Sequence, residues 1–127
     1  MTEQEIRTIL NRQREYFATG ATLSRKFRAE QLGKLKASLQ RHEEELNAAL
    51  QQDLGKSRME SYMCEIGLTL SELTWMQKHL RGLMQEKRVP TPLSQFAAIS
   101  FRSPSPYGTV LIMSPWNYPV LLTLDPL

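Results

Sequence analysis

The sequence predicts a mainly helical N-terminal part followed by a short strand-and-loop part of the α/β class. Two observations support this division. All seven prolines lie at position 90 or later, so this helix-breaking residue is absent from the long first part. The letters TVLIMS, residues 109–114, form a nearly continuous apolar run, which is typical of a strand buried on both faces of a parallel sheet. We therefore expect helices first and about two strands near the C-terminus.

Three helices are predicted before the first proline. The first covers residues 3–19. Thr2 and Glu5 have the spacing of a capping box at its start, and Gly20 can terminate it. Its apolar stripe, at helical spacing, consists of Ile6, Ile9, Leu10, Tyr16 and Phe17.

The second and third helices follow the same pattern. The second is one helix over residues 24–54, ended by Gly55. The third begins after Ser57, which forms another capping-box pair with Glu60, and ends near residue 88, because residues before proline avoid the helical region. The stripes are Phe27, Leu32, Leu35, Leu39, Leu46 and Leu50 in the second helix, and Met59, Tyr62 or Met63, Ile66, Leu70, Leu73, Met76, Leu80 and Leu83 in the third.

The C-terminal part alternates strands and turns. Residues 96–103 (FAAISFRS) are rich in small, β-branched and aromatic residues and predict the first strand. A Ser-Pro-Ser-Pro-Tyr-Gly turn leads to the second strand, residues 109–114. Pro115 ends that strand, and Pro119 suits the first position of a new helix, where proline needs no donor.

Composition excludes several classes of protein. A chain of 127 residues holds one domain at most, and its 41% apolar and 23% charged content is ordinary for a globular protein. The net charge of +3 is spread along the chain, without a basic run that carries aromatics, so nucleic acid is not a predicted partner. No apolar run is long enough for a membrane segment, and the N-terminus lacks a signal-peptide core. Cys64 is the single cysteine, so no metal pair is predicted, and we expect a cytoplasmic protein.

The segment GTVLIMSPWNYP, residues 108–119, resembles the strand and loop that open the NAD(P)-binding domain in the aldehyde dehydrogenase superfamily. The Trp-Asn-Tyr-Pro tetrapeptide after a Gly-x-Val-Leu strand is similar to the class 3-like branch, which acts on fatty and aromatic aldehydes. Upstream, Phe27-Arg28, the run Asp53-Leu54-Gly55-Lys56-Ser57 and Glu65 are similar to the N-terminal helices of that branch. The resemblance covers about residues 15–127, and the loop is its specific part.

The resemblance implies a fold, an organisation and an activity. It implies an α/β enzyme with a Rossmann-like cofactor domain. Residues 1–89 would be an N-terminal helical segment of that domain, residues 90–107 a proline-rich link and β-extension strand, and residues 108–127 a truncated first strand–loop–helix unit. The implied reaction is oxidation of aldehydes to carboxylic acids by NAD or NADP, through a thiohemiacetal on a cysteine. A homodimer, paired through the β-extension, is the implied assembly.

Site residues carry over from the resemblance one by one. Asn117 matches the asparagine whose amide forms half of the oxyanion hole, Tyr118 matches a residue near the aldehyde channel, and Ser114, Pro115 and Trp116 match positions beside the nicotinamide ribose. The chemistry of Asn117 suits this role, because a neutral amide donates a hydrogen bond to a developing negative charge without losing a proton. The alternative reading of the same asparagine is a helix N-cap or a turn residue.

Other titratable residues are predicted to be structural. Lys56 and Ser57 match no catalytic position. Cys64 lacks a nearby histidine or helix N-terminus that would activate its thiol and is expected at the core or its boundary. His42 and His79 are expected at the surface. The carboxylates Asp53, Glu60 and Glu65 are interpreted as a helix end, a cap and part of a solvated face.

The family's nucleophilic cysteine, general-base glutamate, glycine-rich cofactor loop and adenine-side lysine would all lie beyond residue 127. We therefore expect the chain to be the front portion of an enzyme, inactive alone and prone to self-association. The residues expected to lack cover are Val110, Ile112, Val120, Leu121, Leu122 and Leu124. Two alternatives stay open: a free-standing helical module that docks through its apolar tail, and an acyl-coenzyme A-linked relative that reduces acyl-thioesters or oxidises aldehydes with coenzyme A as acceptor.

Overall fold

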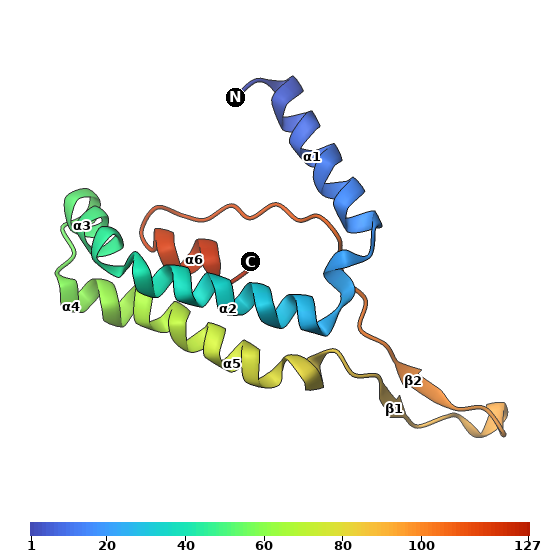
Figure 1. Cartoon of the computed structure of the whole chain (residues 1–127). Helices are drawn as coiled ribbons and strands as arrows, with labels where there is room; N and C mark the ends of the chain where they lie inside the picture. Colours follow the sequence, from blue (N-terminus) through green and yellow to red (C-terminus); the bar gives the residue numbers. More distant parts are fainter.

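The computed structural model describes residues 1–127, and helices dominate it (Figure 1). Helix α2 lies beside α5, and α6 packs against α5 and against the π-helical turn that precedes it. The only sheet is a two-stranded hairpin. The elements are α1 Glu3–Ala18, α2 Arg25–Arg41, α3 Glu43–Leu54, α4 Arg58–Ser61, the π-turn Tyr62–Ile66, α5 Gly67–Leu83, β1 Lys87–Val89, β2 Ser100–Arg102 and α6 Pro119–Leu124, with short 3₁₀ turns at Ala21–Leu23 and Leu93–Gln95.

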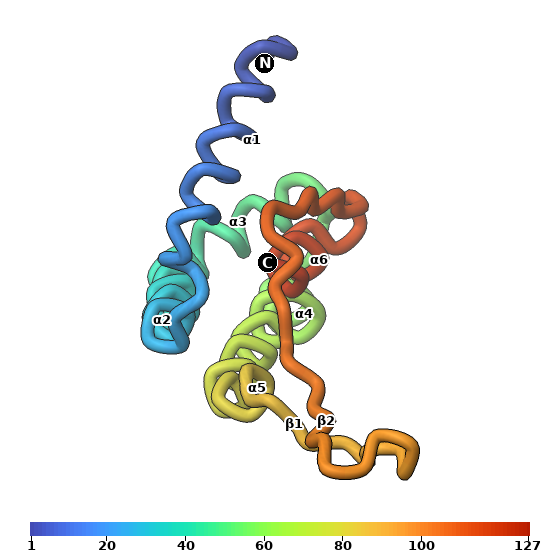
Figure 2. Tube along the Cα trace, turned by 90° about the vertical axis from the view of Figure 1, so that its right-hand side faces the viewer, coloured from blue at the N-terminus to red at the C-terminus, as the bar shows by residue number.

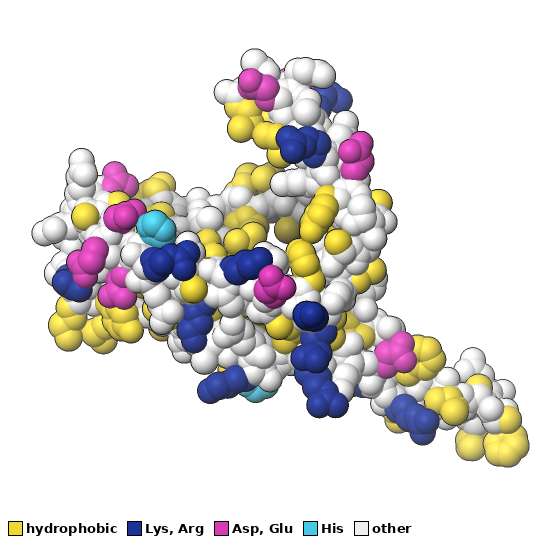
Figure 3. Space-filling view, in the orientation of Figure 1, with side chains coloured by type: hydrophobic (Ala, Val, Ile, Leu, Met, Phe, Trp, Pro, Cys, Tyr) yellow, Lys and Arg dark blue, Asp and Glu magenta, His cyan; other side chains and the backbone are white.

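Two extensions project from the helical body. Helix α1 points away from it at one end, and the β1–β2 hairpin extends in another direction (Figure 2). Helix α1 contains no buried residue. Large apolar side chains lie open along the hairpin, among them Leu93 and Phe96, and Figure 3 shows the apolar colour gathered at its tip. None of the helices combines the length and the apolar character needed to cross a lipid bilayer.

The buried core is small and unusually polar. Ten residues are buried. Five are apolar (Leu39, Leu50, Ile66, Leu73 and Leu80) and five are polar or charged (Asn47, Lys56, Ser61, Glu65 and Thr69). Because buried charges in proteins are almost always paired, Lys56 and Glu65 are each expected to contact a group of opposite charge.

The predicted helix starts are confirmed. Thr2 and Glu5 form the expected capping box, and Gly20, with φ of 74°, follows the end of α1. Ser57 caps α4 by accepting a hydrogen bond from the backbone N–H of Glu60, so the predicted cap is confirmed, but the reciprocal bond from Glu60 that would complete a capping box is absent. Pro119 occupies the first turn of α6, as predicted. Each of these signals acts within a few residues of sequence, so no tertiary contact is needed to produce it.

The second predicted helix is wrong in its continuity, because it breaks into two at His42. Helix α2 ends at Arg41 and α3 begins at Glu43, with His42 at φ of −102° and ψ of 16° between them. Neither glycine nor proline marks the break. Three glutamates fill the first turn of α3, where the positive end of a helix dipole favours negative charge, so the sequence does support a new helix start there.

The third predicted helix is wrong at its end and in its regularity. It contains the π-turn, and α5 stops at Leu83 instead of continuing to about residue 88. Lys87–Val89 forms β1, which pairs antiparallel with β2 in the register Lys87 opposite Arg102 and Val89 opposite Ser100. The cross-strand pairing overrides the helical periodicity that precedes it.

The two predicted strands are only partly present. The strand over residues 96–103 is confirmed at its centre alone, as β2. The predicted strand over residues 109–114 is wrong for this chain: the segment is extended and hydrogen-bonded to no strand. Leu111 and Met113 are 80% and 85% exposed there. An apolar run becomes a strand by pairing with neighbouring strands, and residues 1–127 contain no strand that pairs with residues 109–114.

Candidate functional site

The loop Ser114–Tyr118 lies between the extended segment and α6, and it contains all five predicted site residues. Its first residue is tied to α6, because Ser114 Oγ and Thr123 Oγ1 are 2.6 Å apart. Trp116 is 81% exposed, and Ser114 and Pro115 are also exposed. The loop therefore presents an open face, while its far end turns into the first residue of α6.

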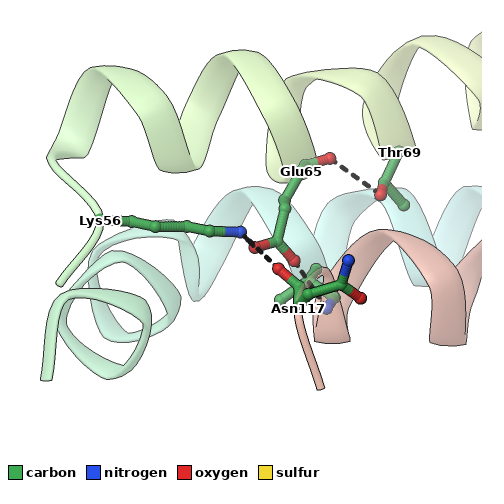
Figure 4. A network of polar contacts seen from close by, with 5 residues as sticks. Lys56, Glu65, Thr69 and Asn117 are labelled. Atoms are coloured by element: carbon green, nitrogen blue, oxygen red, sulfur yellow. Dashed lines mark hydrogen bonds and ion pairs between the residues drawn. The ribbon is translucent and has the colours of Figure 1, made fainter. Parts of the chain in front are cut away.

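Asn117 uses its backbone for anchorage and leaves its side chain free. Its carbonyl oxygen accepts a hydrogen bond of 2.9 Å from Lys56 Nζ. The side-chain amide is exposed, has no hydrogen-bond partner within the chain and points away from Lys56 (Figure 4). The N-cap of α6 is Tyr118, so the alternative that Asn117 caps the helix is wrong. Asn117 lies in the turn before that cap, in agreement with the other half of that alternative, a turn residue.

A buried ion pair, Lys56 with Glu65, contacts the loop from the protein interior. Lys56 Nζ lies 2.5 Å from Glu65 Oε1, and the side chains are 10% and 0% exposed. Lys56 stands between α3 and α4, whereas Glu65 belongs to the π-turn. The ammonium also lies 4.2 Å from the centroid of the Tyr118 ring, in the geometry of a cation–π contact.

The second carboxylate oxygen of Glu65 also reaches the loop region. Glu65 Oε2 accepts a hydrogen bond of 2.8 Å from the backbone N–H of Val120. This N–H belongs to the first turn of α6 and has no acceptor within the helix. Each member of the ion pair thus contacts the partner charge and the backbone near Pro119 (Figure 4).

Sequence reasoning missed both members of this pair. The prediction that Glu65 belongs to a solvated face is wrong, because its side chain is fully buried. A usable signal was present: Ser61, Glu65 and Thr69 are spaced four residues apart and form one buried stripe. A stripe defined by apolar residues alone includes Met59 and either Tyr62 or Met63, all of which are exposed.

The remaining predicted structural residues agree with expectation. Cys64 is half-buried on the π-turn, and His42 and His79 are exposed. His79 Nδ1 contacts the backbone oxygen of Trp75, and its ring stacks on that indole. No three residues of the histidine, cysteine, aspartate and glutamate types are grouped closely enough to hold a metal ion.

A separate cleft of about 700 Å³ lies between α2, α5 and the segment from Pro106 to Val110. Asp125, just after α6, is one of the residues that line it. Burial raises the pKa of the Asp125 carboxyl, and the nearby charge of Glu72 raises it further. This cleft lies apart from the side chains of the loop, because none of the five predicted site residues lines it.

Comparison with known proteins places this arrangement in a family. The family model described as "Aldehyde dehydrogenase family" matches residues 1–127. The chain belongs to the aldehyde dehydrogenase family. The resemblance drawn from the loop motif is therefore confirmed.

Individual aldehyde dehydrogenases align with most of the chain. The 4,4'-diaponeurosporen-aldehyde dehydrogenase of Staphylococcus aureus is 42% identical over 112 residues, 88% of this chain and 24% of that protein. Aldehyde dehydrogenase family 3 member B1 of Homo sapiens is 43% identical over 118 residues, 93% of this chain and 25% of that protein. The chain thus spans about a quarter of the length of the curated relatives it matches. Relatives named as family 3 members confirm the class 3-like part of the resemblance.

A solved structure supports the helical architecture. The substrate-bound state of Staphylococcus aureus AldH matches with a TM-score of 0.92 at 39% sequence identity, covering 95% of this chain and 26% of that chain. The predicted fold class, mostly helical with two strands near the C-terminus, is confirmed, although the second strand is β1 instead of residues 109–114.

Proposed function

We propose that the protein carrying these residues is an NAD(P)-dependent dehydrogenase that oxidises aldehydes to carboxylic acids. Membership of the aldehyde dehydrogenase family supports the class of reaction. The single observation that supports a role for this segment is the state of Asn117. Its amide is exposed and unpaired, while its backbone carbonyl is hydrogen-bonded to a buried lysine.

Asn117 is proposed to stabilise the carbonyl oxygen of the substrate. A cysteine thiolate from outside residues 1–127 attacks the aldehyde carbon, the carbonyl π bond opens, and negative charge develops on that oxygen. An amide N–H held in a fixed place stabilises this charge without rearranging during the reaction. The backbone anchor limits movement of Asn117, and the free amide remains able to donate.

The proposed nicotinamide side of the loop consists of Ser114, Pro115 and Trp116. These residues fit such a neighbour because all three are exposed, and Trp116 offers a broad open surface at 81% exposure. Bound NAD or NADP would supply the hydride acceptor for the reaction. Tyr118 is proposed to border the aldehyde channel, with its ring orientation restrained by Lys56.

The proposed substrates are fatty and aromatic aldehydes. Relatives named as family 3 members support this branch, and one relative is named for 4,4'-diaponeurosporen-aldehyde. The proposed organisation is a Rossmann-like cofactor domain, with residues 1–89 as its helical segment, 90–107 as link and β-extension, and 108–127 as its first strand–loop–helix. The proposed setting is a cytoplasmic homodimer that pairs through the hairpin, whose apolar side chains are open.

The first test compares Asn117→Ala with the unaltered protein, expressed from its complete reading frame. Formation of reduced nicotinamide is followed with a fatty and an aromatic aldehyde. Loss of one oxyanion donor is expected to lower kcat about 10²- to 10³-fold. Asn117→Asp should lower it further, because it places a charge of the wrong sign beside the developing one.

Asn11→Ala provides the matched control, since Asn11 is another exposed asparagine but lies on α1. It should leave kcat unchanged. Absence of aldehyde-dependent turnover in the unaltered protein would contradict the proposed activity. An unaltered kcat in Asn117→Ala would contradict the role of Asn117.

A further inference from the structure

We infer that Lys56 and Glu65 are positioning residues, which act as a clamp that holds the Asn117 amide in place for the oxyanion. This inference rests on the proposed role of Asn117. The clamp is defined as the Lys56–Glu65 ion pair together with its two backbone bonds, to the Asn117 carbonyl and to the Val120 N–H.

The first half of the clamp fixes the peptide after Asn117. Lys56 Nζ donates to the carbonyl oxygen of Asn117 at 2.9 Å and lies 4.2 Å from the Tyr118 ring centroid. A carbonyl held in this way sets the orientation of the peptide plane between Asn117 and Tyr118. The direction in which the Asn117 side chain leaves the backbone is fixed with it.

The second half fixes the other side of Pro119. Glu65 Oε2 accepts from the Val120 N–H at 2.8 Å, while Oε1 remains on Lys56. Proline at 119 has no N–H and a restricted φ. The short stretch from Asn117 to Val120 is therefore held at both ends and is stiff in the middle.

A positioning role explains the burial of two charges better than a stabilising role does. Buried ion pairs are weak contributors to stability, and well-packed apolar residues often replace them without loss. An apolar pair at these positions would lack the donor for the Asn117 carbonyl and the acceptor for Val120. The loop has few other anchors, since Ser114 binds only Thr123 and Trp116 is open.

The π-turn is what aims Glu65 inward. The backbone carbonyl of Glu65 accepts a hydrogen bond of 3.0 Å from Thr69 Oγ1. The N–H of Gly67 donates to the carbonyl of Tyr62, which lies five residues earlier in the chain. Such turns insert a residue into a helix and are frequent at functional sites. Figure 4 shows Glu65 on this segment, directed at Lys56 and at the backbone beside Asn117.

The decisive variant is the double substitution Lys56→Leu with Glu65→Leu, made in the protein expressed from its complete reading frame. It removes both charges together and so avoids an unpaired buried charge. If the pair is a clamp, melting temperature is nearly retained while kcat falls about 10²-fold, the effect expected for a catalytic group displaced by about 1 Å. KM for the aldehyde should change much less, and amide exchange at Val120 should accelerate.

Lys36→Met is the matched control. Lys36 is another partly buried lysine, but it donates to Thr74 Oγ1 at 2.7 Å between α2 and α5, away from the loop. It should change stability without changing kcat or the exchange of Val120. The single substitution Lys56→Leu leaves Glu65 unpaired and should lower both the melting temperature and kcat.

The outcomes separate the clamp from the proposed function. Asn117→Ala reducing kcat while the double variant keeps both kcat and slow Val120 exchange would overturn the clamp and leave the oxyanion role intact. A double variant that loses kcat only in proportion to lost folded protein would also overturn it. If Asn117→Ala has normal kcat, the proposed function of Asn117 fails, whatever the exchange of Val120 shows.

Discussion

Asn117 and Asp125 show how differently two polar residues near α6 are treated by their surroundings. The Asn117 side chain is left open while its backbone is bound. The Asp125 carboxylate meets partial burial and the like charge of Glu72, and its pKa is raised for these two reasons. The first arrangement suits recognition of another molecule. The second arrangement lowers the stability of the folded state at neutral pH.

The cost at Asp125 has a defined pH dependence. A carboxyl whose pKa is raised by folding favours the protonated form in the folded state. The penalty is absent when the carboxyl is protonated in both states, and it grows as the pH rises through the raised pKa. Asp125→Asn should therefore increase the melting temperature at neutral pH and leave it unchanged at acid pH, and the gain should be small because the residue is largely solvated.

Thermal melts of Asp125→Asn, Glu72→Gln and the double variant test this coupling. Both single substitutions remove the same repulsion. The double variant should therefore gain less in melting temperature at neutral pH than the two single variants gain together. A lower melting temperature for Asp125→Asn at neutral pH would contradict the assigned cause.

At the scale of elements, the segment from Ser57 to Leu83 depends on a glycine. A Cβ built on Gly67 would lie 2.7 Å from the Tyr62 carbonyl oxygen and 3.0 Å from its ring. The close approach is part of the π-turn, because the Gly67 N–H donates to that carbonyl. Any side chain at position 67 must therefore distort the turn that carries Glu65.

Gly67→Ala is expected to destabilise the fold by about 1–3 kcal/mol, in the range of other overpacked sites. Gly82→Ala is the control on the same helix, since nothing lies within 4 Å of its added Cβ. Alanine there should stabilise by about 0.5–1 kcal/mol, as in other helices. Chemical denaturation of both variants measures the difference. Equal gains in stability would contradict the importance of the π-turn.

Local signals made some elements predictable and left others hidden. The capping pair at Thr2 and the proline that starts α6 act over a few residues, so sequence reasoning found them. The break at His42 carries no glycine or proline, and β1 forms by pairing with β2, which begins only at Ser100. Elements that depend on partners elsewhere in the chain were missed for that reason.

The candidate site divides in the same way. The loop could be predicted because its residues are contiguous and form a distinctive motif. The clamp could not, because Lys56 and Asn117 are 61 residues apart and no periodicity links them. Apolar patterning also gave the wrong prediction for Glu65, because such a pattern assigns glutamate to the surface and this glutamate is buried.

At the scale of the whole molecule, most of the large apolar side chains near the C-terminus lack cover. Val110, Leu111 and Met113 are exposed, while Ile112 and the apolar residues of α6 are half-buried. The expected lack of cover is thus confirmed fully for Val110 and partly for the others. Exposed apolar surface of this kind marks a site of association.

The polypeptide of residues 1–127, produced by itself, is expected to self-associate and to show no dehydrogenase turnover. Its single cysteine lies on the π-turn without an activating neighbour, so it cannot supply the nucleophile. Sedimentation at several concentrations measures the association. Replacing Leu111 and Met113 by serine should weaken it, while Met59→Ser, at another exposed position on α4, should have a smaller effect. Aldehyde-dependent turnover by this polypeptide would contradict the expectation.

The long separation between Lys56 and Asn117 also has a consequence for the order in which the chain folds. Closing a loop of 61 residues costs entropy before its contacts form. The neighbouring helices, by contrast, are joined by short connections and assemble from local contacts. We therefore expect the segments that carry Lys56 and Glu65 to assemble first, and the proline-stiffened loop to dock onto this buried ion pair as the last step of folding.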